Sequence, residues 1–566
     1  MREKISKIVE HAISAAVDAG EINLSSIPDT AIERARDISH GDWATTVALR
    51  VAKEAGMSPR AIAEVIVKHI DKSDIIENIE IAGPGFINFR LSPKVFQDIV
   101  IQARSEKRDF GKSDMGKGTR VQIEFISANP VGPMHVGHGR WAALGDSMAL
   151  VMEHAGYDVE REFLLNDVGV QMDIFAHSVA ARYLEICGQT VEFPENGYKG
   201  SYIKDIAQEI YDDEGPKWAD IDAGERDAYF KEKAYAQVLT HLKEVLHDVG
   251  VDFDVWFSER NVHALDENGE NDITRSIAFL REKGFIYEED GAVWFRSTAF
   301  DDDKDRVLAK SDGTYTYFAA DVAYHANKFE RGFDLVINIW GADHHGYIAR
   351  VMAAVAALGY PGQLEIVLGQ LVSLYRDGEL VRMSKRTGEM ITFEELVDEI
   401  GVDAARYYFV RRSSDQPLDF DIELAKKNTS ENPLYYVQYA HARICSILRK
   451  AAQEGSAAAD IDVLADALIP ADVNVGLLTH EAELALMRKI AELGEVVERA
   501  ARDRAPFRLT HYAEEMASTF HQFYTQCKVI TDDKDVTAAR LYLADAARHV
   551  LATSLSLIGV HAPTSM

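Results

Sequence analysis

The stretch from Val121 to Arg140, VQIEFISANPVGPMHVGHGR, limits the possible folds of this 566-residue chain more than any other segment. Its first residues form a short apolar run with β-branched members, which predicts a strand, and the sequence NPVGP then ends that strand with turn signals. Apolar residues at helical spacing follow as far as Gly156, and Tyr157–Leu165 is predicted to be the next strand. A strand–helix–strand unit of this kind exposes backbone N–H groups at the start of its helix, which favours an anion such as phosphate.

Two histidines stand where this helix should begin. His135 and His138 are three residues apart, so both imidazoles lie on one side of a helical turn and can donate to a phosphate. Gly137 between them leaves room for a flat ring close to the backbone. For the HxGH pattern alone, a zinc pair and two unrelated surface histidines are alternatives, although a zinc site needs further ligands and the sequence contains neither HExxH nor CxxC.

A second signal is the basic segment Arg382–Arg386, RMSKR, which follows a predicted hairpin with an Asp377-Gly378 turn. A lysine on such a loop can close over a triphosphate. Alone, the segment is also compatible with an ordinary solvated basic turn. Together, HVGH after a strand and RMSKR about 250 residues later resemble the two signatures of class I aminoacyl-tRNA synthetases, with Arg382 in place of the usual leading Lys.

Five longer segments narrow this resemblance to one family. They lie in order along nearly the whole chain: EFISANPVGPMHVGHGR, LNDVGVQ, GYKGSYI, WGADHHGYI and NPLYYVQYAHAR. All five resemble arginyl-tRNA synthetases. The resemblance implies an α/β fold, with a doubly wound parallel-sheet (Rossmann-like) catalytic domain, a small α+β N-terminal domain and an all-α C-terminal anticodon-binding bundle.

The pattern along the chain agrees with three domains. Residues 1–107 combine an amphipathic helix with alternating strands around a Gly-Pro-Gly turn, and we assign them to the N-terminal tRNA-contacting domain. Residues 108–400 alternate strand and helix signals and form the class I catalytic domain, with an insertion at about 195–300. Residues 401–566 show helical spacing and no strand pattern, which predicts the helical anticodon-binding domain.

The resemblance implies an arginine–tRNA ligase. Such an enzyme uses ATP to convert L-arginine to arginyl-adenylate and transfers the arginyl group to the 3′ end of tRNA(Arg), releasing AMP and pyrophosphate; in this family, activation requires tRNA. Mg²⁺ should accompany ATP as its substrate complex, and we expect no protein-bound structural metal. The alternative is a stand-alone adenylyltransferase or ligase of the same HxGH nucleotide fold without tRNA, which would leave the C-terminal helices without a role.

Both chemical steps concentrate negative charge on phosphates, so catalysis needs positioned donors rather than a side-chain nucleophile. The resemblance makes His135, His138 and Lys385 the catalytic residues, with the histidines on the ATP phosphates and the lysine on the departing pyrophosphate. The residues that it assigns to ATP are His135, Gly137, His138, Asp343, His344, Met383, Ser384, Lys385 and Arg386.

Arginine is a planar cation with five donors, and its recognition calls for buried carboxylates. The resemblance assigns Glu124 and Asp321 to the guanidinium, although Asp321 is also compatible with a capping or ion-pairing role on a surface helix. The residues assigned to arginine are Glu124, Ser127, Asn129, Tyr317, Asp321 and His344. The sequence leaves open whether Asp343 and His344 meet arginine or the nucleotide.

Six residues are predicted to contact tRNA: Phe86, Asn88, Tyr436, Tyr439, Arg443 and Met566. The first two match a family pattern, (F/Y)xN, that reads a D-loop base, but a core ring and a strand-end cap are the plainer alternative. The tyrosines and Arg443 share one helix face, a stripe that is often core, yet an arginine that continues the stripe favours stacking on unpaired bases. The last residue matches a family position at the anticodon.

The net charge of −31 argues against a nucleic-acid partner, because Lys and Arg supply phosphate contacts. A tRNA partner therefore requires basic side chains to gather on part of the surface. No apolar run approaches the ~18 residues of a membrane span, and the polar amino end does not resemble a signal peptide. We expect no membrane association, a cytoplasmic location and, by family resemblance, a monomer.

Overall fold

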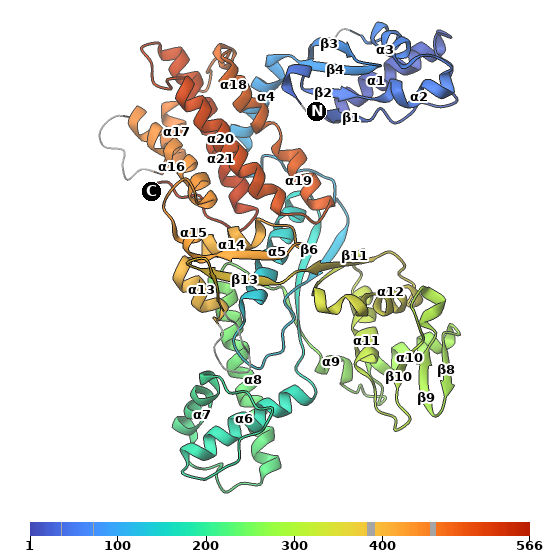
Figure 1. Ribbon diagram of the computed structural model, residues 1–566, viewed down its shortest axis with the longest axis vertical. Coiled ribbons are helices and arrows are strands. Elements are labelled where there is room, and N and C mark those ends of the chain that lie inside the picture. The colour runs from blue at the N-terminus through green and yellow to red at the C-terminus, as the bar shows by residue number, and fades with distance from the viewer. Residues whose placement is uncertain (36, 72, 382–390, 453–459) are drawn as a thin grey trace. The chain divides into compact units, whose positions relative to one another are not determined.

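The computed structural model describes residues 1–35, 37–71, 73–381, 391–452 and 460–566 (Figure 1). The described chain divides into two compact units. The first comprises Met1–Ser105, Asp466–Ala491 and Gln522–Ala546, and the second comprises Glu106–Ala465, Glu492–His521 and Ala547–Met566. The domain borders drawn from the sequence, at about 107 and 400, stay predictions.

The amino-terminal part of the first unit is a small α+β fold, as predicted. Its antiparallel sheet has the strand order β1-β2-β4-β3. Helix α1 packs through one apolar stripe at helical spacing, which runs from Ile5 to Ala16. The elements are α1 Arg2–Asp18, β1 Ile32–Arg34, β2 Trp43–Thr45, α2 Val47–Ala55, α3 Pro59–Lys68, β3 Ile76–Ala82, β4 Phe86–Leu91 and α4 Pro93–Glu106.

The second unit is built on a five-stranded sheet in which all neighbouring strands run parallel, in the order β12-β11-β5-β6-β7. The chain builds the sheet outward from β5 on one side and from β11 on the other, so the order reverses between these two strands. Ligands of such sheets bind at the carboxyl ends of the strands beside this reversal. The elements are β5 Arg120–Glu124, α5 Val136–His154, β6 Asp158–Leu165, β7 Val255–Ser258, β11 Leu335–Gly341, α12 Ile348–Ala357 and β12 Leu364–Gly369. The predicted doubly wound parallel sheet is confirmed.

Two long crossovers carry additional elements. Between β6 and β7 run α6 Val170–Ile186, α7 Ser201–Glu214 and α8 Ala223–Asp248, which form one helical group in Figure 1. Between β7 and β11 run α9 Arg260–His263, α10 Asp272–Glu282, β8 Ile286–Glu289, β9 Ala292–Phe295, β10 Arg306–Ala309 and α11 Tyr317–Glu330. Helices α10, α11 and α12 share one hydrophobic core, to which Ile277, Val322 and Val351 contribute.

The remainder of the chain begins with the predicted hairpin and continues mainly as helices. Strands β13 (Val372–Arg376) and β14 (Glu379–Leu380) are antiparallel, and Asp377 and Gly378 between them have φ angles of 52° and 80°. The helices are α13 Phe393–Ile400, α14 Val402–Val410, α15 Ile422–Lys426, α16 Pro433–Ala451, α17 Ile461–Leu468, α18 Glu481–Ile490, α19 Leu493–Arg502, α20 Phe507–Gln526 and α21 Lys534–Ser556. The predicted all-α C-terminal bundle is confirmed.

The expectation of no strand after residue 400 is wrong at one place. Strand β15, Leu418–Asp421, pairs in parallel with β13. Leu418 and Phe420 are buried and Asp419 and Asp421 are exposed, which is the alternation of a half-buried strand. Four residues of alternation are too few to stand out beside long helical segments.

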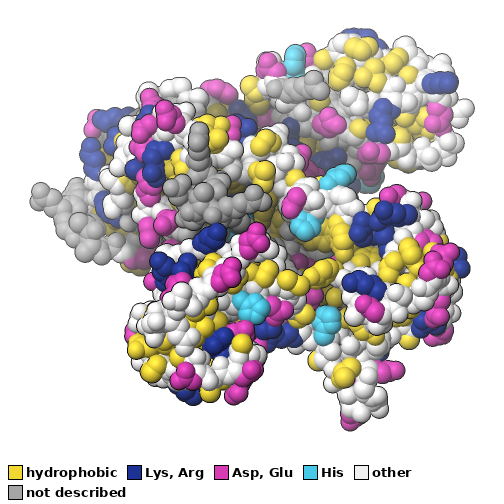
Figure 2. All heavy atoms as spheres, turned by 60° about the horizontal axis from the view of Figure 1, so that its bottom comes forward, with side chains coloured by type: hydrophobic (Ala, Val, Ile, Leu, Met, Phe, Trp, Pro, Cys, Tyr) yellow, Lys and Arg dark blue, Asp and Glu magenta, His cyan; other side chains and the backbone are white. Residues whose placement is uncertain are grey.

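The surface carries both signs of charge. On the face drawn in Figure 2, Lys and Arg side chains lie in several separate groups with Asp and Glu side chains between them. Among the helices of the described ranges, none is both long and apolar enough to cross a membrane.

Gly145 on α5 should be intolerant of a side chain, because the ring of Phe125 fills the space beside it. A Cβ atom added at Gly145 would lie 2.2 Å from the Phe125 ring, which is fully buried beneath the helix. Overpacking of a filled core costs about 1–3 kcal/mol. We expect Gly145→Ala to lower the unfolding free energy by this amount in urea titrations followed by circular dichroism.

The matched control is Gly346→Ala, since a Cβ atom there would meet nothing within 4 Å and its backbone does not need glycine. Equal urea midpoints for the two variants would show that the helix can shift away from Phe125 without cost.

Candidate active site

The first signature begins with an unusual backbone turn at the end of β5. Ile126 and Ser127 have φ angles of 69° and 43°, a region that residues other than glycine rarely adopt. The Ser127 hydroxyl donates to Glu124 Oε1 at 2.8 Å and accepts from the Leu164 backbone N–H of β6 at 3.2 Å. These bonds hold the strained turn at the carboxyl edge of the sheet, beside the reversal in strand order.

The two signature histidines lie together at the start of α5, as predicted. His135 is the N-cap residue, and its Nδ1 accepts from the His138 backbone N–H at 3.3 Å. The two rings stack with their centroids 3.6 Å apart. Gly137 makes this stack possible, because a Cβ atom there would lie 2.9 Å from the His135 ring. A helix start that carries two side-by-side imidazoles can bind phosphate oxygens.

The second signature lies outside the described residues: Arg382, Met383, Ser384, Lys385 and Arg386 all fall between 382 and 390. The chain that comes next is bonded to the first signature. Thr392 forms an antiparallel bridge with His135, and the Phe393 N–H donates to the Met134 carbonyl at 2.9 Å. The Phe393 ring also packs against Gly139, where a Cβ atom would lie 2.3 Å from it.

A cavity of about 350 Å³ opens beside the signature turn. Its polar lining comes from several elements and includes Asn129, Asn166, Glu259, Tyr317 and Asp321. This volume lies at the lower end of the range for small-molecule sites and suits an amino acid. Of the residues predicted to bind arginine, Asn129, Tyr317 and Asp321 therefore line one cavity.

Two carboxylates in this cavity have raised pKa values. Burial raises the pKa of Glu259 to about 7, and the nearby charges of Asp321 and Asp167 add to the effect. Burial also raises the pKa of Asp321 to about 6, although the Tyr347 hydroxyl donates to its carboxylate. Both pKa values rise because burial takes water away from the charged forms, and a cation in the cavity would restore them, so the site is suited to a positively charged ligand.

Glu124 does not line the cavity and belongs to a buried polar network. Burial alone would raise the pKa of its carboxyl, but the fully buried Lys328 ammonium bonds to it and brings the pKa below the usual value. Lys328 also donates to Asn338 Oδ1 at 2.9 Å, and the Asn338 amide bonds to His325 Nε2 at 2.9 Å. His325 Nδ1 donates to the Asp321 carbonyl at 2.8 Å. The network therefore connects the end of β5 with the backbone of the cavity residue Asp321.

Burial and the Lys328 charge lower the pKa of His325 to about 4, so its imidazole is neutral at physiological pH. A neutral ring with its proton on Nδ1 fits the carbonyl that it faces and leaves Nε2 to accept from Asn338.

Two other predicted residues lie near the end of β11. Asp343 and His344 belong to the short 3₁₀ helix Ala342–Tyr347, and both side chains are exposed. His344 Nε2 lies 3.7 Å from Asp343 Oδ2. They do not line the cavity, so their assignment to arginine or ATP stays open.

Sequence reasoning missed several residues of this region. Glu259 directly follows the carboxyl end of β7, and that position in a parallel sheet is the signal that could have found it. Asn166 and Gln171 belong to the LNDVGVQ segment, which contributed only to the family resemblance. Lys328 gave no signal, because its partner Glu124 lies 204 residues earlier. Over the described residues, no group of three or more His, Cys, Asp or Glu side chains is arranged to hold a metal ion.

Comparisons with known proteins agree with this geometry. Three family models match the chain: "Arginyl tRNA synthetase N terminal domain" at residues 3–91, "tRNA synthetases class I (R), catalytic domain" at 100–425 and "DALR anticodon binding domain" at 437–566. The arginine–tRNA ligase of Heliobacterium modesticaldum is 47% identical over 100% of this chain and 99% of its own. That of Listeria monocytogenes is 46% identical over 100% of both chains. The Thermus thermophilus arginyl-tRNA synthetase shares the fold, with a TM-score of 0.74 at 22% identity and 100% of both chains covered.

The chain belongs to the arginyl-tRNA synthetase family. It therefore ligates arginine to tRNA. The alternative of a stand-alone adenylyltransferase is not favoured, because the family models match the amino-terminal and helical carboxyl-terminal regions as well as the catalytic domain.

The predicted tRNA residues of this synthetase lie in different surroundings. Phe86 is exposed at the start of β4, whereas Asn88 is buried in the same strand. On α16, Tyr436 and Tyr439 flank the His521 ring of α20, with centroids 5.0 and 5.9 Å from it.

The other two predicted tRNA residues, Arg443 and Met566, lie nearer the carboxyl end of the chain. Arg443, two turns after Tyr436 on α16, is half-buried, and Met566 is exposed at the end of the chain. Tyr436 is partly exposed and Tyr439 is exposed, so both residues keep surface that a partner can contact.

Arginine affinity should fall as the pH drops through 7. Glu259 is half-protonated near pH 7 and Asp321 near pH 6, and each must ionise before it can pair with a guanidinium. Affinity is therefore full above the higher pKa and is lost below it. The dissociation constant for arginine, measured by calorimetry, should rise about 20-fold from pH 8 to pH 6.

The control is Glu259→Gln, which should bind arginine more weakly at pH 8 but keep only the inflection near pH 6. An unchanged titration curve in this variant would mean that the pH-sensitive group lies elsewhere.

Proposed function

We propose that arginine binds in the cavity with its guanidinium between Asp321 and Glu259. The observation that carries this proposal is the presence of two carboxylates with raised pKa values in one cavity. The cavity lies beside the turn that leads into α5, the helix that begins with the first signature and is called the signature helix below. A planar guanidinium offers donors to both at fixed angles, and its charge offsets the cost of their burial. Asn129 and Tyr317 then contact the amino acid head or stem.

Glu124, Ser127 and His344 complete the predicted arginine set. Of these, Glu124 is the one whose carboxylate is already occupied by other side chains. Its two carboxylate oxygens are already bonded to Lys328 and Ser127. This favours Glu259 as the second carboxylate on the guanidinium, while Glu124 holds the turn that carries Ser127 and Asn129.

ATP binds at the start of α5 in this proposal. His135 and His138 donate to its phosphates and Gly137 lies against it. Lys385 meets the departing pyrophosphate, with Met383, Ser384 and Arg386 in support; for these four residues the proposal rests on the sequence alone. Asp343 and His344 are exposed near the end of β11 and are available to the nucleotide. Mg²⁺ arrives with ATP, held mainly by phosphate oxygens and water.

The reaction proceeds on this arrangement in two steps. The arginine carboxylate attacks the α-phosphorus of ATP, and pyrophosphate leaves; a hydroxyl of the terminal tRNA adenosine then attacks the arginyl carbonyl, and AMP leaves. Charge builds up on phosphate oxygens in both steps, where the helix start, the imidazoles and Lys385 can stabilise it. Arginine activation requires bound tRNA, as the family resemblance implies.

The tRNA contacts divide between the two ends of the chain. Phe86 stacks on a base at the tRNA corner beside Asn88, and Tyr436, Tyr439, Arg443 and Met566 meet the anticodon. The half-exposed tyrosines around His521 support this role, because unpaired bases stack on such rings. A cytoplasmic monomer is proposed from family membership alone.

Asp321→Asn should damage arginine recognition selectively. The variant keeps the shape of the side chain but removes one of the two charges that face the guanidinium. Breaking a buried ion pair costs about 3–5 kcal/mol, which should appear as a lower kcat/KM for arginine while the KM for ATP stays nearly constant.

The matched control is Asp312→Asn, since Asp312 is an exposed loop aspartate that bonds to the neighbouring Thr314. If Asp321→Asn charges tRNA with arginine as efficiently as the parent, the guanidinium must bind elsewhere.

Arg443→Ala should weaken tRNA binding without affecting the chemistry. Loss of one stacking side chain costs about 1–3 kcal/mol, so the dissociation constant of cognate tRNA should rise about 5- to 150-fold in filter-binding assays. Transfer from preformed adenylate at saturating tRNA should keep its rate.

Arg281→Ala serves as the control, because Arg281 is an exposed cation of α10 that pairs with the exposed Glu288. If Arg443→Ala changes only the melting temperature, the face of α16 belongs to the core and does not contact tRNA.

A further inference from the structure

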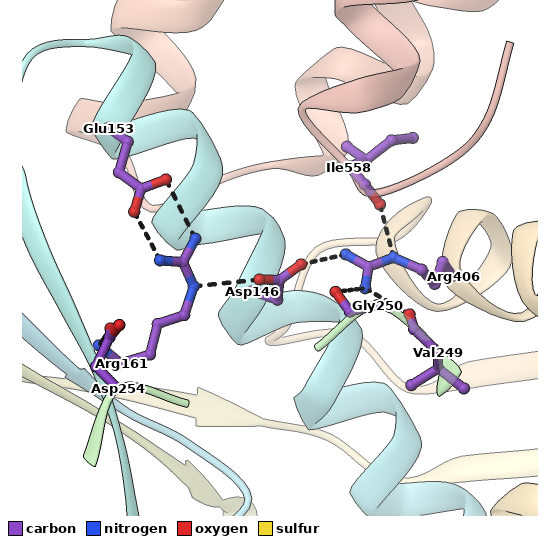
Figure 3. Close-up of polar contacts among 8 residues, drawn as sticks. All are labelled: Asp146, Glu153, Arg161, Val249, Gly250, Asp254, Arg406 and Ile558. Atoms are coloured by element: carbon purple, nitrogen blue, oxygen red, sulfur yellow. Dashed lines mark hydrogen bonds and ion pairs between the residues drawn. The ribbon is translucent and has the colours of Figure 1, made fainter. Parts of the chain in front are cut away.

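A buried group of charged side chains lies outside the candidate site and centres on Asp146 of α5 (Figure 3). Asp146 is 4% exposed and accepts from two arginines: Arg406 of α14, which is 2% exposed, and Arg161 of β6, whose Nε lies 3.2 Å away. Arg161 is in turn paired with Glu153, near the carboxyl end of α5. The proposed reaction uses none of these groups.

Besides the Asp146 carboxylate, Arg406 binds three backbone carbonyl groups. Its Nε donates to the Ile558 carbonyl at 3.1 Å, just beyond α21, and its Nη1 donates to the carbonyls of Val249 and Gly250 at 3.0 and 3.2 Å, just beyond α8. Gly559 lies against the guanidinium, where a Cβ atom would come within 2.0 Å of Nη2. One side chain therefore connects the ends of α8 and α21 with the signature helix (Figure 3).

The same helix α14 also holds the last residues of the chain, His561–Met566, which we call the tail. Asp403, one turn before Arg406, accepts from the His561 backbone N–H at 3.0 Å and from His561 Nδ1 at 2.9 Å. Gln438 of α16 donates to both Asp403 and the His561 carbonyl, each at 2.9 Å.

Two more bonds fasten the tail along α16. His441 Nδ1 donates to the Pro563 carbonyl at 2.8 Å, and Arg449 donates to the Thr564 carbonyl at 2.6 Å. The tail thus lies on the helix that carries Tyr436 and Arg443, and it is bonded to α14 through Asp403.

Stability alone is a poor explanation for this arrangement, because a buried ion pair adds little stability over well-packed apolar residues. The arrangement provides fixed geometry instead. Asp146 lies eight residues after His138 on one continuous helix, about 12 Å along its axis. A helix of this length moves as a rigid rod, so a shift of Arg406 reaches the histidines at the start of α5.

We propose that Arg406 and Asp403 are positioning residues that join the tail and α16 to the signature helix, so that tRNA bound at α16 and the tail fixes the position of His135 and His138. The inference rests on the proposed tRNA-binding role of α16 and the tail. It predicts that loss of Arg406 lowers kcat for aminoacylation while leaving tRNA affinity nearly unchanged.

A double-variant cycle tests the connection in the full-length enzyme. The variants are Arg406→Met, deletion of residues 561–566, and both changes together. Arg406→Met leaves Asp146 paired with Arg161, and Asp146→Asn is the second variant if the first does not fold. For each protein, the measurements are kcat with saturating arginine, ATP and tRNA, the tRNA dissociation constant and the melting temperature.

We expect each single change to lower kcat by about 3- to 30-fold, and the double variant to lose no more than the worse single one. The deletion should also weaken tRNA binding, whereas Arg406→Met should not. Arg406→Lys, which keeps the charge but not the fork of donors, should recover part of kcat.

Arg104→Met is the matched control, because Arg104 is an arginine whose side chain is only 13% exposed and is paired with Asp545 and Asp466 in the first unit. Arg104 is not part of the proposed connection. In a variant that combines Arg104→Met with the deletion, the loss of kcat should therefore equal the product of the two separate losses.

Two results would overturn the inference. Multiplying losses in the Arg406→Met double variant would show that the two sites act independently, while the tRNA surface itself stands. Unchanged tRNA affinity after the deletion would show that the tail does not bind tRNA, and the proposed function of that surface would fail with the inference.

Discussion

The candidate site depends on the parallel pairing of β5 with β11, two strands separated by about 210 residues in sequence. Parallel neighbours cannot be joined by a tight turn, so the chain must leave the sheet and return through long crossovers. Each crossover therefore places the carboxyl end of another parallel strand at the same edge of the sheet. The signature turn after β5 and Glu259 after β7 meet at this edge, and Asp321 arrives on α11 just before β11 begins.

Buried charge pairs set the positions of these elements. Lys328 reaches from α11 to Glu124 on β5, and Arg406 reaches from α14 to Asp146 on α5. Each lysine or arginine must bond at the distance and angle that its partner allows, because an unpaired charge at these depths costs several kcal/mol. An apolar contact between the same helix and strand would tolerate a small displacement of one against the other. The pairs therefore specify the register of helix against sheet more sharply than they add stability.

Local structure and the features implied by the family resemblance could be predicted from the sequence. The strand, turn and helix of the first signature, the hairpin at Asp377-Gly378 and the α+β amino-terminal fold were predicted and are confirmed. Strand β15 was missed, because its alternation lasts four residues and its partner β13 lies about 45 residues earlier. Lys328 was missed for a similar reason, since a lysine on a helix gives no sign of burial until its distant carboxylate is known. Glu259 directly follows a strand and was within reach of prediction.

The two carboxylates of the cavity bear on how an arginine site rejects its competitors. Arginine, lysine and citrulline have stems of similar length, so reach does not separate them. In the proposed arrangement a planar guanidinium satisfies Asp321 and Glu259 together, whereas a lysine ammonium is a point charge that leaves acceptors unpaired. Neutral citrulline would leave both carboxylates without a cation, in surroundings that already raise their pKa values to about 6 and 7. Sites built on polar complementarity can discriminate by about 10⁴- to 10⁵-fold without editing. The charge that makes the empty cavity unfavourable is therefore the same feature that makes it selective.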